Sequence, residues 1–324
     1  MEAPKKDIDK REYVRWAYRL FLDREPENAE VLDRVFQDTQ SLRKIFMGSV
    51  EYTQKNIDIV DESKEKWVFY DTSFHFRIYV NLMETAICRP VLFDSYEPSE
   101  TKLLQTLIRK DDHVLDIGAN IGFHTLLMAT LVEEGGMVFA FEPIPFLNHA
   151  LCNSIKENSF HHIKVFDAAL SNKQGHFEMI YLPYAENAGG PFLNVHQETL
   201  AGHNTIQVQT MKLDDLRFEK TIDFIKMDAE GAEAMILDGG REFFKAHRPK
   251  ILSEVHPFQL QRVSNISAVQ YLRQLNDVGY ACYNINCWDE KITNWDEETI
   301  GNILCVDADE GEDWKILLKS GSRA

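Results

Sequence analysis

Short apolar runs alternate with helical stripes through the middle of this 324-residue chain, and that alternation limits its fold more than any other feature. The runs have the length and composition of strands, and they lie at 113–117, 137–141, 163–167, 222–227 and 250–255. Most of the stretches between them carry apolar side chains at helical spacing, for example Leu147, Leu151 and Ile155. Strands that alternate with helices predict a parallel sheet covered by helices on both faces, which is an α/β fold.

Two segments depart from the alternation. The strand-like stretches Tyr280–Asn286 and Ile303–Val306 follow one another with no helix between them, which predicts a closing antiparallel hairpin. Residues 171–212 hold two further strand-like runs that flank a loop, 184–194, which could cover an acceptor or could be an ordinary hairpin connection.

The ends of the chain differ from its middle. Residues 10–52 carry short helical stripes that are interrupted at Arg24-Glu25-Pro26, and the last residues are rich in Asp and Glu. We therefore expect a small helical domain with a linker over residues 1–60, the sheet domain over 61–310 and a solvated tail over 311–324.

Composition excludes several classes of partner. Lys and Arg total 35 against 52 Asp and Glu, so the formal net charge of −17 disfavours nucleic acid, which needs a basic surface. The five cysteines are an odd number without C-x-x-C spacing, which indicates free thiols in a reducing compartment. The N-terminus lacks the apolar segment of a signal peptide, and the longest apolar run, around Leu126–Val132, is too short to cross a bilayer. We expect a cytoplasmic protein without a transmembrane segment.

The loop after the strand at 113–117 carries the first functional signal, and with that strand it reads Val114-Leu-Asp-Ile-Gly-Ala-Asn-Ile-Gly122. Gly118 and Gly122 let the backbone turn tightly and approach a ligand, and the helix that follows directs free N–H groups at the same point. Asn120 replaces the second glycine of a dinucleotide-binding loop, and Asp116 suits a cationic amino group better than a pyrophosphate. The loop therefore favours S-adenosylmethionine over NAD.

Two later strand ends extend this signal. Glu142-Pro143 follows the second strand about twenty residues after the loop, where an acidic side chain can accept hydrogen bonds from ribose hydroxyls. Asp167-Ala168 follows the third strand, where a carboxylate could accept from the adenine amino group. Each acid alone would more often be a turn or cap residue. Their order nevertheless predicts a row that contacts the amino group, the ribose and the adenine of one nucleoside.

Several segments together resemble the FkbM family of methyltransferases. They are Tyr96-Glu-Pro98, Val114–Gly122, Phe141-Glu-Pro143, Ala168-Ala-Leu-Ser-Asn172, Leu213-Asp-Asp-Leu216 and Ile225-Lys-Met-Asp-Ala-Glu-Gly-Ala-Glu233. The resemblance implies a Rossmann-like class I methyltransferase sheet of seven strands with the last one antiparallel. It also implies methylation that depends on S-adenosylmethionine, usually on an oxygen of a sugar or natural product.

The N-terminal region carries a looser resemblance. Residues 13–26 and Gly48-Ser-Val-Glu-Tyr52 are similar to a small helical domain, reminiscent of phycobilisome linkers, that occurs beside enzymes of polysaccharide assembly. These helices are candidates for contact with a second copy of the chain or with a glycan-assembly partner.

Residues for catalysis are expected at the ends of the fourth and fifth strands, because an alcohol acceptor must lose its proton to a base or to a metal-bound site. We predict that Asp228 lies near the methionine amino group or the acceptor and that His256 is the general base. Glu230, Glu254 and Asn187 are candidates for contact with the substrate. The residues predicted to bind the cofactor are Asp116, Gly118, Ala119, Asn120, Gly122, Thr125, Glu142, Pro143, Asp167, Ala168 and Asp228.

Structural roles compete with some of these assignments. Lys226 could pair with Glu254 across adjacent strands, and Glu230 could be a first-turn helix acid that the helix dipole favours. The spacing of Asp228, Glu230 and His256 matches no metal-ligand motif, so we predict no metal.

The sequence thus predicts an O-methyltransferase that acts on a hydroxyl of a sugar, glycan or natural product. One alternative is an N-methyltransferase that acts on a peptide or amino sugar. Another is a module that binds an adenosyl ligand without turnover in a glycan-assembly complex.

Overall fold

The computed structural model of the chain describes residues 10–22, 24–27, 30–33, 66–182, 190–287, 290–311 and 313–319. The chain divides into two compact units, Met1–Lys66 and Trp67–Ala324, close to the boundary predicted after residue 60.

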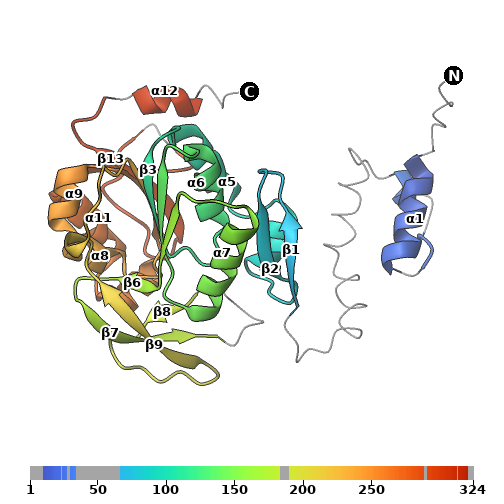
Figure 1. The fold of residues 1–324 in the computed structure, drawn as a ribbon, viewed down its shortest axis with the longest axis horizontal. Helices are drawn as coiled ribbons and strands as arrows, with labels where there is room; N and C mark the ends of the chain where they lie inside the picture. The colour runs from blue at the N-terminus through green and yellow to red at the C-terminus, as the bar shows by residue number, and fades with distance from the viewer. Residues whose placement is uncertain are drawn as a thin grey trace. The chain divides into compact units, whose positions relative to one another are not determined.

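A seven-stranded sheet forms the centre of the larger unit (Figure 1), in the order β12-β13-β11-β10-β3-β4-β5. Its strands are β3 (His113–Ile117), β4 (Met137–Phe141), β5 (Ile163–Phe166), β10 (Phe224–Met227), β11 (Lys250–Val255), β12 (Tyr280–Asn284) and β13 (Gly301–Asp307). β13 pairs antiparallel with β11 and β12, and the other pairings are parallel. This confirms the predicted Rossmann-like class I sheet and its antiparallel last strand.

Helices cover both faces of this sheet, with α6 and α7 on one side and α8, α9 and α11 on the other (Figure 1). The helices are α4 (Cys88–Leu92), α5 (Pro98–Leu107), α6 (Phe123–Val132), α7 (Pro145–Glu157), α8 (Glu233–Gly239), α9 (Arg241–His247), α10 (Pro257–Gln259) and α11 (Ala268–Asp277). Every residue of β3 and β10 is buried between these layers, which explains why both strands read as apolar runs instead of alternating patterns.

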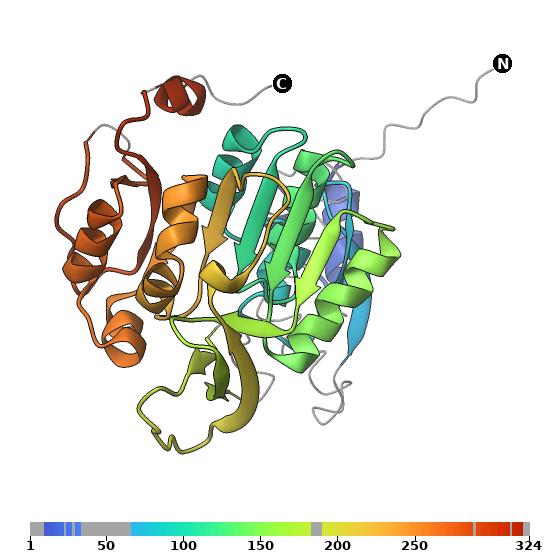
Figure 2. The same ribbon diagram turned by 60° about the vertical axis from the view of Figure 1, so that its left-hand side comes forward.

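A smaller sheet of four strands stands at the edge where the strands of the large sheet end (Figure 2). It consists of β6 (Ala168–Leu170), β7 (Gly175–Tyr181), β8 (Phe192–Leu193) and β9 (Asn204–Met211), and β7 and β9 are the two predicted runs between residues 171 and 212. A hairpin of β1 (Trp67–Asp71) and β2 (Arg77–Asn81) packs on α7, where the Tyr79 amide donates to the Ser154 hydroxyl at 2.9 Å.

The smaller unit contains α1 (Lys10–Leu22) and a short 3₁₀ helix, η1 (Glu30–Asp33). Val14, Ala17, Tyr18, Leu22 and Val31 form its apolar cluster. The Gly48–Tyr52 segment lies outside the described residues, and the likeness to phycobilisome linkers stays a prediction.

The segment after residue 310 is not wholly the solvated tail that we predicted. Residues Asp313–Lys319 form helix α12, and the Trp314 side chain is 3% exposed, with its ring 4.8 Å from that of Tyr283. The prediction was wrong here because the surrounding acidic residues obscured one large apolar side chain whose burial anchors the helix. Within the described ranges, no helix combines the length and apolar character needed to cross a membrane.

Candidate active site

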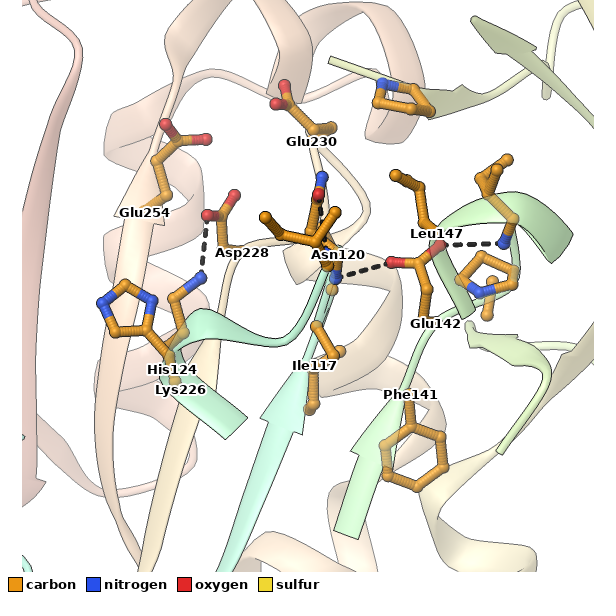
Figure 3. Close-up of a pocket in the computed structure, with 18 of the residues that line it drawn as sticks. Ile117, Asn120, His124, Phe141, Glu142, Leu147, Lys226, Asp228, Glu230 and Glu254 are labelled. Carbon is orange, nitrogen blue, oxygen red and sulfur yellow. Dashed lines mark hydrogen bonds and ion pairs between the residues drawn. The ribbon is translucent and has the colours of Figure 1, made fainter. Parts of the chain in front are cut away.

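A pocket opens at the carboxyl ends of β3, β4, β10 and β11 (Figure 3). The strand order reverses here, because β4 follows β3 on one side and β10 lies on the other side. Open α/β sheets bind their ligands at such a point. Pro191 and Leu193 of the smaller sheet region also line the pocket, and both belong to the loop predicted to cover the acceptor.

The loop after β3 forms the floor of this pocket. Gly118, Asn120 and Gly122 have φ values of 82°, 52° and 91°, so three of its residues adopt the left-handed conformation. A Cβ atom on Gly118 would stand 1.8 Å from the Asp228 carbonyl oxygen, so only glycine allows this loop to approach the end of β10. Gly118, Ala119 and Asn120 line the pocket, whereas Gly122 is the N-cap of α6.

Asp116 and Thr125 support the loop from behind. Asp116 is fully buried, and its Oδ2 accepts a hydrogen bond from the Thr125 hydroxyl at 2.5 Å. Burial raises the pKa of Asp116, and the nearby Lys226 and Thr125 counteract part of that effect. Neither residue is among those that line the pocket, although we predicted that both contact the cofactor. Through this hydrogen bond with Thr125, the Asp116 carboxylate links the end of β3 to the first turn of α6.

Glu142 is the acid of the predicted row that does line the pocket. Its carboxylate accepts hydrogen bonds from the backbone N–H groups of Asn120 and Ile144, each at 2.8 Å (Figure 3). Burial raises its pKa to about 7. Each carboxylate oxygen can accept a further bond, so hydroxyl groups of a ligand can still be bound. The side chains around it are apolar, and this "apolar end" of the pocket comprises Phe141, Glu142, Pro143, Ile144, Leu147, Ala169 and Leu170.

The structure does not bring Asp167 into the same pocket. Asp167 is exposed and lines a second hollow, which shares Pro143 with the first. Ala168 is buried at the start of β6 and is not among the lining residues. Of the predicted row of three acids, Glu142 lies in the pocket, Asp116 behind it and Asp167 outside it.

The opposite end of the pocket is charged, and Figure 3 shows its labelled side chains across from Glu142. This "charged end" comprises Tyr96, Glu97, His124, Lys226, Asp228, Glu230 and Glu254. The Lys226 ammonium group lies 3.0 Å from Asp228 Oδ2. The alternative pairing of Lys226 with Glu254 is therefore wrong, because the lysine bonds along its own strand end.

Protonation at the charged end follows from burial among like charges. Burial works to lower the pKa of Lys226, but the carboxylates of Asp228, Glu97 and Asp116 raise it more. Burial and the neighbouring Asp228 raise the pKa of Glu230 to about 9, and the same two causes raise that of Glu254 well above its ordinary value. Both carboxyl groups therefore bind a proton more readily than an exposed glutamate does.

The alternative role for Glu230 as a first-turn helix acid is also wrong. Glu230 has a φ of 50° and precedes α8, and it lines the pocket. Glu233 occupies the first turn instead, where its buried carboxylate accepts from the Ala229 amide at 2.7 Å.

One group of carboxylates is close enough to share a cation. Single oxygens of Asp228, Glu230 and Glu254 lie within 4.8 Å of one another, so the grouping differs from the set with His256 that we weighed. Lys226 already supplies positive charge to Asp228, and we propose no metal here.

The sequence did not predict that Tyr96 and Glu97 line the charged end of the pocket. Tyr96 and Glu97 precede α5, and the Tyr96 ring packs 5.4 Å from Phe123 and 5.6 Å from His124. The Tyr96-Glu-Pro98 motif was the available signal, but only the tertiary fold places it beside the loop after β3. The His124 side chain is also buried and lines the pocket, and the sequence assigned it no role.

Two further predicted residues stand apart. His256 caps α10 directly after β11 and is half-buried, but it is not among the described residues that line the pocket. Asn187 lies outside the described residues. Their assigned roles stay predictions.

Comparison with known proteins identifies the family. A family model described as "Methyltransferase FkbM domain" matches residues 116–282, which is just over half of the chain. The chain belongs to the FkbM methyltransferase family. That part of the resemblance is confirmed, and the cofactor of this FkbM methyltransferase is S-adenosylmethionine.

Individual relatives of this FkbM methyltransferase are distant. "Methyltransferase 1" of Beauveria bassiana is 24% identical over 146 residues (40% of this chain, 58% of that protein), and "Methyltransferase sdnD" of Sordaria araneosa is 25% identical over 154 residues (39% and 59%). The chain thus spans less than two thirds of either relative. Similar solved structures include a methyltransferase FkbM from Methylobacillus flagellatus KT (16% identity, 93% of this chain and 63% of that one, TM-score 0.40). TYW2 from M. jannaschii in complex with AdoMet is another (14%, 76% and 86%, TM-score 0.41).

The pocket fits this cofactor chemically. Its apolar end offers flat apolar surface and one buried carboxylate, which suits an adenosyl group with two ribose hydroxyls. Its charged end presents an ammonium group and carboxylates together, which suits an amino acid that carries both signs.

Proposed function

We propose that this FkbM methyltransferase methylates a hydroxyl oxygen of a sugar, glycan or natural product. The observation that carries the proposal is the contrast between the two ends of one pocket. The apolar end suits the adenosyl group, and the carboxylates of the charged end can bind the hydroxyl groups of an acceptor, which are hydrogen-bond donors.

The donor would be held by residues from three strand ends. The backbone of Gly118, Ala119 and Asn120 would face it from below, Glu142 would accept from the ribose hydroxyls, and Asp228 would bind the methionine amino group. S-adenosylmethionine would supply a sulfonium methyl group whose carbon a nucleophile attacks in line; S-adenosylhomocysteine would leave, and the electron pair of the broken C–S bond would stay on its sulfur. The protein contributes mainly by positioning the acceptor and removing its proton.

A screen of the full-length protein with S-adenosylmethionine and a panel of sugars and hydroxylated metabolites tests this proposal. We expect a mass increase of one methylene unit on a hydroxylated acceptor, with the methyl group on oxygen by NMR. Calorimetry should show binding of S-adenosylmethionine and S-adenosylhomocysteine but not of NAD. Tighter binding of NAD, or no turnover with any acceptor class, would contradict the assignment.

A second candidate is N-methylation of an amine on a peptide or amino sugar. The grouped carboxylates of Asp228, Glu230 and Glu254 favour it, because they attract a protonated amine. Including amines in the same screen separates the two candidates, since the position of the methyl group identifies the acceptor atom. A protein that binds the donor without turnover in either set would be the non-catalytic module.

We further propose a cytoplasmic location, which the free thiols of all five cysteines suit. We also propose that the smaller unit, Met1–Lys66, binds a second copy or a glycan-assembly partner. Sedimentation of the full chain tests the second copy, and a purely monomeric species would contradict that part.

A further inference from the structure

The side chain of His124 is buried, and one of its ring nitrogens has no hydrogen-bond partner among the described residues. His124 is the second residue of α6, its side chain is 4% exposed, and it lines the charged end of the pocket. Its Nδ1 lies 3.7 Å from Glu97 Oε2. Its Nε2 is buried and has no hydrogen-bond partner among the residues that the structure describes. A buried imidazole nitrogen without a partner is costly, and His124, unlike His113, lines the pocket, where a ligand can supply the partner.

Glu97 is held beside His124 by an unusual backbone. Its φ of 40° lies in the left-handed region, which is strained for a residue with a Cβ atom. Pro98 follows and opens α5, so the chain cannot relax into an earlier helical turn. The Tyr96 ring lies 5.6 Å from the imidazole and restricts its rotation. Strain of this kind persists where the surrounding structure needs one fixed geometry.

The electrostatics of the charged end keep the imidazole neutral. Burial lowers the pKa of His124 well below its usual value, Lys226 lowers it further, and Asp228 opposes them. The charged groups that face this ring are therefore Lys226, Asp228 and Glu97. A neutral imidazole carries one proton, and the carboxylate of Glu97 favours its location on Nδ1. The lone pair of Nε2 is then free, in a side chain that lines the charged end of the pocket.

We propose that His124 is the general base of this methyltransferase and that Glu97 is its positioning residue. The proposal rests on the proposed function, because it assumes a hydroxyl acceptor. The acceptor O–H bond breaks as an N–H bond forms at Nε2, and the oxygen uses its electron pair to bond the methyl carbon as the C–S bond of the donor breaks and its electron pair stays on sulfur. The negative charge of Glu97 balances the positive charge of the imidazolium. After the product leaves, the imidazolium returns its proton to water. His124 thereby takes the role that the sequence assigned to His256.

The tautomer of His124 tests this dyad without any acceptor. The full chain would be labelled with nitrogen-15 histidine, and the His124 signals would be assigned from their loss in His124→Gln. We expect a proton on Nδ1 and a bare Nε2 at pH 7, and a shift of the proton toward Nε2 in Glu97→Gln. A protonated Nε2 in the wild type, or no change in Glu97→Gln, would overturn the proposal.

Turnover provides the second test once the screen has supplied an acceptor. His124→Gln should lower kcat at least 100-fold, the size expected for loss of a general base, and change the Kd of S-adenosylhomocysteine less than threefold. His113→Gln is the matched control, because His113 is also buried with an unpartnered Nδ1 but lies at the opposite end of β3. Its kcat should equal that of the wild type.

The outcomes separate this inference from the proposed function. A His256→Gln variant without turnover, combined with an active His124→Gln variant, would reject the dyad and leave O-methylation intact. An enzyme that methylates only amines would reject the proposed function, whatever the tautomer of His124.

Discussion

The two ends of the pocket are built in different ways. The apolar end is centred on Glu142, whose carboxylate accepts hydrogen bonds from the backbone N–H groups of Asn120 and Ile144, and most of its residues follow one another from the end of β4 into α7. The charged end draws its side chains from before α5, from α6 and from the ends of β10 and β11, segments far apart in the sequence. The first is a local motif that many donor-binding folds can share. The charged end forms only when the whole domain has folded. We propose that its side chains select one acceptor over another.

Removing the ammonium group of the charged end should have the largest effect. Lys226→Met leaves the carboxylate of Asp228 without its partner, and breaking a buried pair costs about 3–5 kcal/mol of the free energy of unfolding. Urea denaturation measures the loss. Arg241→Met removes an exposed ion pair with Asp238 and should cost less than about 1 kcal/mol. If the two variants lost the same free energy of unfolding, the ion pair of Lys226 with Asp228 would contribute no more than an exposed one.

For each carboxyl and each pH unit, the pH dependence of stability should be the next largest effect. The pKa values of Glu142 and Glu233 are raised by burial to about 7, and that of Glu230 to about 9. Each group binds a proton more tightly in the folded state, so its contribution is complete below about pH 4.5 and is lost as the pH rises through the folded value.

The free energy of unfolding should therefore fall between pH 5 and pH 9, by about 1.4 kcal/mol per pH unit for each carboxyl that lies between its two pKa values. Denaturation at several pH values measures the slope. Glu230→Gln should flatten it between pH 7 and pH 9, and Glu134→Gln, at an exposed site, should not. A stability that rises over this range would contradict the assignment.

Glu142→Gln tests the apolar end. The amide NH₂ group would face the N–H of Asn120 or Ile144, so the loop loses an acceptor and the ribose loses a charged one. Loss of hydrogen bonds to a charged group predicts a 10- to 100-fold higher Kd for S-adenosylhomocysteine by calorimetry. Glu254→Gln, at the charged end, should raise it less than threefold. The opposite ranking would reverse the assignment of the two ends.

The smallest effect is expected at Asp167. Because it is exposed and outside the main pocket, Asp167→Ala should change the Kd of S-adenosylhomocysteine less than threefold. A tenfold loss would restore the sequence-based prediction that this carboxylate contacts the adenine.

The sequence predicted the sheet well, because buried parallel strands such as β3 and β10 leave an unmistakable apolar run. The sequence also indicated that the loop with Gly118 and the carboxylate of Glu142 lie beside one ligand site, and both line the pocket. It could not tell that Asp116 faces Thr125, since a carboxylate at a strand end can turn to either side. The approach of Glu97 to His124 depends on how α5 packs against α6, and no spacing along the chain encodes that contact.

The missing side chain of Gly118 has a consequence for how this enzyme could diversify. The loop after β3 contacts the end of β10 so closely that neither can shift alone. The distance between Asp228 and the proposed binding site of the methyl donor is therefore fixed before any ligand binds. Within the smaller sheet, β6 lines the apolar end with Ala169 and Leu170, whereas β7 and the β8 region line the cavity with Met179, Pro191 and Leu193. Substitutions in β7 and β8 could therefore admit new acceptors while the transfer geometry is inherited unchanged.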